Sequence, residues 1–197
     1  SLPHRCDGCA QRFTVEHAMS CKKGGLVLLR HNDVMAEWHH LCAMALTPSA
    51  VSDDPLINTG QDSRDETPQI AEPPKELCGD VGVHGFWKQG TTAIFDIHVT
   101  DLDAWSHRTH DPKKILLRHE KAKKVKYNDL CLARRRSFTP LVFSVDGLRG
   151  PESEAASKRL AALLSKKWSR PYTLLSVPSS GAAWPLRWLV QRAGACV

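Results

Sequence analysis

Apolar side chains recur at helical spacing in two segments of this 197-residue chain. The first segment ends before Pro48, and Asn32 or Asp33 can cap its beginning. Its apolar face is expected to consist of Val34, Trp38, Leu41, Cys42 and Ala45. The second segment, residues 152–168, has the spacing of an amphipathic helix. The pattern therefore predicts two helices that each bury one face against a core.

Between these helices the pattern changes to strands. Residues 80–87 and 92–100 are predicted strands, and in the second one an apolar face alternates with a face that carries Asp96 and His98. A long basic helix at 111–134 follows, because Asp-Pro is a typical helix start. A further strand is predicted at 141–145. This order of elements predicts an α/β fold in which helices flank a mixed sheet.

Changes in composition divide the chain into five segments. We expect a small metal-binding unit at 1–24, a strand (26–29) or buried connector and a helix at 25–47, an acidic proline-rich linker at 48–76, the core at 77–172 and a divergent tail at 173–197. The linker is expected to be a loop. A ligand cluster so close to Ser1 suggests a fragment or C-terminal module of a longer polypeptide. The tail has no clear period, and either a frameshifted end or a short apolar helix fits it.

Charge is unevenly distributed along the chain, whose net charge is +6. Residues 113–136 hold ten bases against two acids, and residues 51–80 hold eight acids against two bases. Basic density of this kind suits a phosphate backbone, because each neutralised phosphate releases counterions. A solvated lysine-rich helix face would give the same charge. The candidate nucleic-acid-binding residues are Arg30, His31, Lys121, Lys123, Lys126, Arg134, Arg135 and Arg136.

Four potential metal ligands lie near the beginning of the chain. Cys6 and Cys9 form a C-x2-C pair, and His17 and Cys21 are four residues apart, so one helical turn would bring the second pair to the same side. Zinc binds four such ligands in a tetrahedron, and the spacing predicts a zinc knuckle. Two buried cysteines, an unrelated thiol and a core histidine are the alternative. The remaining thiols are expected to be reduced in an intracellular protein: Cys42, Cys78, Cys131 and Cys196.

Two aspartates of the predicted strands are candidates for a second metal site. Asp80 and Asp96 could hold Mg²⁺ or Mn²⁺ and leave positions for water and phosphate. They must then lie nearly opposite each other, which requires a wide loop at 85–89 rather than a tight turn at Gln89-Gly90. We expect the wide loop. A strand-end cap and a buried hydrogen-bonded carboxylate are the alternative roles.

The pattern of Asp80 followed by Asp96-Ile97-His98 resembles the restriction-endonuclease-like core, PD-(D/E)xK, with His98 in the position of the lysine. A wider set of motifs resembles the C-terminal endonuclease region of non-LTR, target-primed retrotransposon polyproteins over residues 6–172. These motifs are the knuckle, Arg30-His31-Asn32, the aspartate pair and Lys124-x-x-Tyr127. In that family the lysine has moved to the helix, which fits its absence from position 98.

The resemblance implies a nuclear phosphodiesterase that nicks DNA to expose an end for reverse transcription. Asp80 and Asp96 would hold Mg²⁺ or Mn²⁺, Lys124 would orient water or offset charge, Tyr127 would support Lys124 or contact phosphate, and His98 would accept a proton. A solvated lysine and a core-edge tyrosine are the alternatives for Lys124 and Tyr127. The implied partners are DNA and an upstream reverse transcriptase domain of the same polyprotein, with the element RNA as a further candidate and no membrane.

Two other classes of function fit the same sequence. The first is a non-catalytic, zinc-containing nucleic-acid-binding module in which the aspartates are structural. The second is a decayed retrotransposon remnant, which the irregular tail would suit. Dependence of cleavage on a divalent cation separates the enzyme from both.

Overall fold

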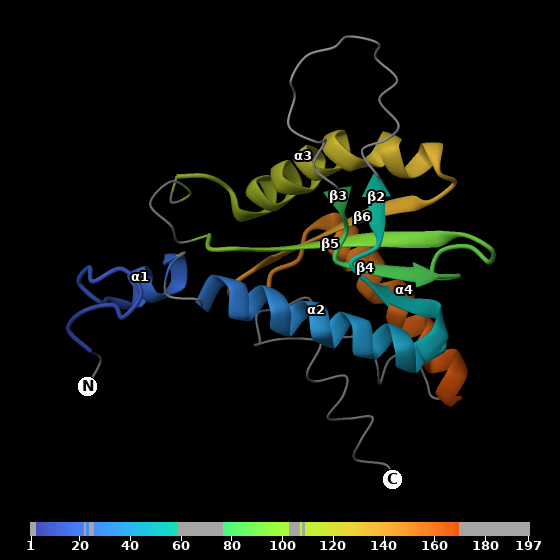
Figure 1. The fold of residues 1–197 in the computed structure, drawn as a ribbon, viewed down its shortest axis with the longest axis horizontal. Coiled ribbons are helices and arrows are strands. Elements are labelled where there is room, and N and C mark those ends of the chain that lie inside the picture. Colours follow the sequence, from blue (N-terminus) through green and yellow to red (C-terminus); the bar gives the residue numbers. More distant parts are fainter. Residues whose placement is uncertain are drawn as a thin grey trace, which may run out of the picture.

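A mixed four-stranded sheet forms the centre of the molecule in the computed structural model (Figure 1), which describes residues 3–21, 23, 26–58, 77–102, 107 and 109–169. The strand order is β1-β4-β5-β6, and the first three strands are antiparallel neighbours while β5 and β6 are parallel. The strands are β1 (Val51–Asp53), β4 (Val81–His84), β5 (Thr92–Thr100) and β6 (Ser137–Ser144). A two-stranded sheet pairs β2 (Leu56–Asn58) with β3 (Leu77–Cys78).

Helices cover both faces of this sheet. In Figure 1, α3 (Pro112–Ala133) lies on one side, and α2 (Leu26–Ala45) and α4 (Pro151–Trp168) lie on the other. Because parallel strands need a crossover connection, α3 joins β5 to β6 across one face. Asp111 caps α3 by accepting a hydrogen bond from the backbone N–H of Lys113. The predicted α/β architecture, a mixed sheet flanked by helices, is confirmed.

The main core lies between the sheet and the α2–α4 layer. All five residues of the predicted apolar face of α2 are buried: Val34, Trp38, Leu41, Cys42 and Ala45. The Trp38 ring meets the Phe95 ring at 5.2 Å between centroids, and Phe86 packs against both. Strand β5 alternates as predicted. Ala93, Phe95 and Ile97 join this core, while Ile94 packs in a smaller cluster beside α3.

Three expectations about the first third of the chain are wrong: the strand at 26–29, the helix cap at Asn32 or Asp33, and the loop over residues 48–58. Residues 26–29 are the first turn of α2 and not a strand, so Asn32 and Asp33 lie inside the helix and do not cap it. Leu28 and Leu29 are exposed, so the expected burial does not hold for these two residues. The segment 48–58 is ordered, because Ile57 packs beside α3 and β1 pairs with β4. Residues 59–76 and 170–197 lie outside the described residues.

Candidate functional site

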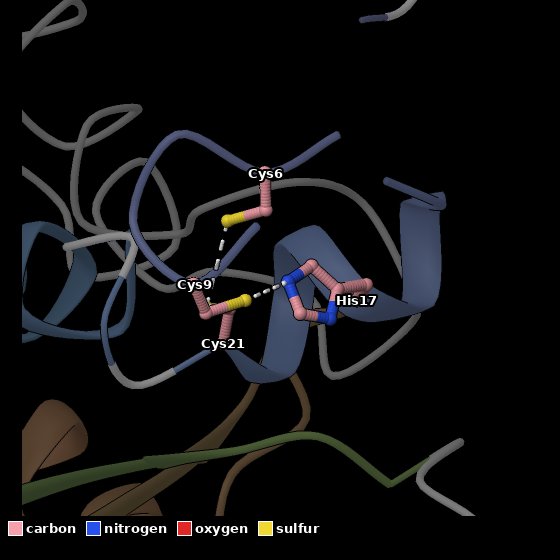
Figure 2. A group of neighbouring side chains, drawn as sticks. All are labelled: Cys6, Cys9, His17 and Cys21. Atoms are coloured by element: carbon pink, nitrogen blue, oxygen red, sulfur yellow. Dashed lines mark hydrogen bonds between the residues drawn. The ribbon is translucent and has the colours of Figure 1, made fainter. Parts of the chain in front are cut away.

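The four predicted zinc ligands converge near the beginning of the chain (Figure 2). Their ligand atoms all lie within 4.8 Å of one another. The Sγ atom of Cys21 is 3.7 Å from the Sγ atoms of both Cys6 and Cys9, and Cys9 Sγ is 3.1 Å from His17 Nε2. Thiolates bound to zinc at about 2.3 Å in a tetrahedron stand roughly 3.8 Å apart. Cys6, Cys9, His17 and Cys21 could therefore hold a zinc ion, as the sequence predicted.

Local backbone structure brings these ligands together. The C-x2-C turn closes with a hydrogen bond from the Ala10 N–H to the Cys6 carbonyl, and Ala10 has a φ of 59°. Thr14 caps α1 (Val15–Ser20), and α1 carries His17 on the turn below Cys21. The hydrogen bond with His17 lowers the pKa of the Cys6 thiol, which favours the thiolate form that binds metal.

The second candidate site forms where β4 begins beside β5. Val81 pairs with Phe95, and the Asp80 N–H donates to the Phe95 carbonyl at 2.9 Å, so Asp80 lies beside Asp96. His84 pairs with Thr92, which leaves residues 85–91 as a wide loop. Gly85 and Gly90 both have positive φ in this loop. The wide-loop prediction is confirmed, and with it the predicted register of the aspartates.

The Asp80 carboxylate is held at both oxygens. Oδ2 accepts a hydrogen bond from the Ile97 N–H at 2.5 Å, and Oδ1 lies 3.5 Å from His31 Nε2. The hydrogen bond with Asp80 raises the pKa of His31. His31 was expected to contact nucleic acid or to cap a helix, and the structure instead places it on a candidate metal ligand.

Asp96 forms an ion pair with Lys123. Asp96 is buried at 8% exposure, and burial raises the pKa of its carboxyl even though Lys123 acts in the opposite direction. The lysine comes from α3, which lies over this face of β5. The ammonium group beside Asp96 therefore comes from helix α3. It belongs to Lys123, whereas the resemblance placed the lysine at position 124.

The expectation for Lys124 is wrong in its geometry. Lys124 Nζ lies 2.5 Å from Glu152 Oε1, so it pairs with the first turn of α4 and not with an aspartate of the site. Neighbouring residues on a helix point about 100° apart, and in this structure Lys123 is the one of the two lysines that pairs with Asp96. Tyr127 packs its ring on Phe138, 5.3 Å between centroids, at the edge of an apolar cluster. The structure thus gives Tyr127 the core-edge position that was its alternative.

His98 shares the face of β5 that carries Asp96 and stacks on His119 of α3, with ring centroids 4.8 Å apart. His107 contacts His119 in turn. Burial lowers the pKa of His98 to about 4. His98 is therefore neutral near pH 7, and it does not supply the positive charge of the lysine whose position it takes.

The remaining basic candidates are distributed over the surface. Lys121, Lys126 and Arg135 are exposed, whereas Arg30 and Arg134 are half-buried. Arg136 donates a hydrogen bond to the Leu56 carbonyl at 2.7 Å. His31, Lys123 and Arg136 thus contact other groups of the protein, and Lys126 lies over the Tyr127 ring, so these four are not side chains that only face solvent.

Compared by sequence, the chain matches no protein-family model and no curated protein. Among the described residues, no helix combines the length and the apolar character needed to cross a bilayer.

Proposed function

We propose that this chain is a divalent-metal-dependent DNA endonuclease with a restriction-endonuclease-like fold. The observation that carries the proposal is the side-by-side placement of Asp80 and Asp96 with Lys123 on Asp96. The mixed sheet with helices on both faces supports the fold assignment. On this proposal the chain nicks target DNA for a retrotransposon polyprotein in the nucleus, beside the element RNA and an upstream reverse transcriptase domain.

The donor set fits Mg²⁺ or Mn²⁺. Both are hard cations that prefer carboxylate oxygens, and two neighbouring aspartates leave other positions for water and phosphate. When bound, the cation would polarise the scissile phosphate and make a water a better nucleophile. Asp80 and Asp96 hold the cation in this scheme.

Lys123 acts on the same phosphate in this scheme. Its ammonium group reaches the site from α3, so it can offset the negative charge that develops on the phosphate or orient the attacking water. His98 is neutral and half-buried, and in this scheme it would accept the proton of the attacking water, which makes its ring cationic; its lowered pKa makes it a weak base for that role near pH 7. The exposed lysines and Arg118 of α3 would bind the DNA backbone.

Nicking of supercoiled plasmid tests the proposal. The purified chain should relax the plasmid only when Mg²⁺ or Mn²⁺ is added, and Asp96→Asn should lose the activity because it removes a ligand charge while keeping the side-chain shape. Asp111→Asn is the matched control, since Asp111 caps α3 away from the aspartate pair. Equal nicking by the parent and Asp96→Asn would overturn the assignment.

A non-catalytic nucleic-acid-binding module is the second candidate, and the exposed basic residues of α3 favour it. Such a module would retain DNA with zinc present and Mg²⁺ omitted, and no version of the chain would cleave. If the chain neither binds nor cleaves DNA, the result would fit a decayed retrotransposon remnant.

A further inference from the structure

His31 occupies a position that the proposed chemistry does not yet use. It lies in the second turn of α2, and its Nε2 atom is 3.5 Å from Asp80 Oδ1. Its side chain is 29% exposed and that of Asp80 is 20% exposed, so both are partly shielded from water. A polar contact in such surroundings fixes orientation better than the same contact on an open surface.

The two oxygens of Asp80 are held by two different elements. The backbone N–H of Ile97 in β5 fixes Oδ2, and His31 from α2 fixes Oδ1. A carboxylate held on both sides cannot rotate freely about its terminal torsion. Groups that hydrogen-bond to a metal ligand in this way typically contribute strongly to metal affinity, because they fix the direction of the ligand's lone pairs.

We propose that His31 is a positioning residue that orients the Asp80 carboxylate for the divalent cation. This inference rests on the proposed function, and it assigns to His31 a role inside the protein in place of a contact with nucleic acid. The same helix begins five residues after the last of the four Cys and His ligands, and α1 packs against it. The position of α2 on the sheet therefore determines the distance between His31 and Asp80.

The chain contains a matched control for this contact. His39 lies two turns further along α2, and its Nε2 atom is also 3.5 Å from an aspartate oxygen, Oδ1 of Asp53. The His39 side chain is 33% exposed, close to the value for His31, but Asp53 is 69% exposed. His39→Leu thus removes an equivalent pair from the same helix without touching the proposed site.

Mn²⁺ binding to the zinc-loaded chain, followed by calorimetry or by the electron paramagnetic resonance of free Mn²⁺, measures the effect directly. His31→Leu should weaken Mn²⁺ binding about 10- to 100-fold. His31→Gln should restore most of the affinity, because its amide N–H can stand near the position of Nε2. The nicking rate of His31→Leu should recover at saturating Mn²⁺, since positioning acts on metal affinity.

The outcomes separate this inference from the proposed function. If Asp96→Asn abolishes Mn²⁺ binding while His31→Leu binds like the parent or like His39→Leu, the positioning role is wrong and the metal site stands. If the parent itself does not bind Mn²⁺, the proposed function fails. If His31→Gln and His31→Leu lose affinity equally in folded protein, the hydrogen bond is not the cause and the inference is overturned.

Discussion

At the scale of single residues, the identity of the lysine beside the aspartate pair distinguishes two neighbouring positions of α3. Lys123 pairs with Asp96, and Lys124 pairs with Glu152. We expect Lys123→Ala to lower plasmid nicking by about 100-fold or more, because one preorganised positive group is removed from the reacting phosphate.

Lys124→Ala is the control for this prediction, since it removes the adjacent lysine from the same helix. It should leave nicking near the parent level and change the free energy of unfolding by only about 0–1 kcal/mol, as for other partly exposed ion pairs. Single-turnover nicking rates and urea denaturation of both variants provide the measurements. The reverse order of the two nicking rates would restore Lys124 to the site.

The sequence could not decide between these two lysines for a geometric reason. Ile115 and Leu116 are both buried, so the face that α3 turns to the sheet spans two adjacent positions. Glu120 is buried as well, and Lys123 and Lys124 follow it by three and four positions, so both lysines lie near that face of the helix. The aspartates were easier, because strand alternation and one loop length fixed them. The His31 contact required tertiary packing of α2, which no local pattern contains.

At the scale of elements, the junction of α3 and α4 depends on a buried acid. Glu120 is 1% exposed, and its Oε1 atom accepts hydrogen bonds from the backbone N–H groups of Glu152 and Ser153. Helix α4 begins after Gly150, which has no side chain to cap it. Glu120 thus replaces the missing cap from a neighbouring helix.

This junction predicts a dependence of stability on pH. Burial raises the pKa of Glu120 to about 7, above its ordinary value of 4.5. Between these values the folded chain holds a proton that the unfolded chain releases, so the free energy of unfolding contributed here falls as pH rises and levels off above about 7. Each pKa unit is worth about 1.4 kcal/mol.

Glu120→Gln keeps an accepting oxygen and cannot ionise, so urea denaturation at about pH 5 and about pH 8 should show a smaller difference than in the parent. Glu154→Gln is the control. Glu154 lies in the first turn of α4, the helix that Glu120 caps, but it pairs with Lys158 at the surface. An unchanged pH dependence in Glu120→Gln would show that the carboxyl stays ionised in the folded chain.

Local patterns predicted the helices and strands of the core, but they missed the beginning of α2, extended β4 beyond its end at His84, and placed the start of β6 at 141 and not at Ser137. The amphipathic faces of α2 and α4 and the alternation of β5 are repeated signals that packing reinforces. The apolar run at 26–29 contains residues that favour both strand and helix, and Leu28 and Leu29 in it are exposed. The sequence of such a run does not indicate which element, if any, packs against it.

At the scale of the whole molecule, the zinc-binding unit and the main core are separate sources of stability. None of the four ligands belongs to the large hydrophobic cluster between the sheet and the α2–α4 layer. Removing zinc with a chelator, or replacing Cys9 by Ser, should therefore unfold the segment that carries the ligands and leave the core folded.

Two-dimensional NMR of the zinc-loaded and chelated chain measures this outcome. Amide signals of residues 3–21 should lose their dispersion, while those of β5 and β6 keep their positions. Elemental analysis should give about one zinc per chain before chelation, as four ligands hold one ion. Collapse of the β5 and β6 signals would show that the core depends on the metal after all.

The parallel pairing of β5 with β6 has a consequence for how the protein folds. The two strands are separated in the chain by the whole of α3, and the aspartate pair further needs α2 and β4, from earlier in the chain. Contacts between distant parts of a chain are slow to form, because closing the loop costs entropy before the new contacts stabilise the chain. His31, Asp80, Asp96 and Lys123 should therefore come together in a late step of refolding, well after α3 becomes helical.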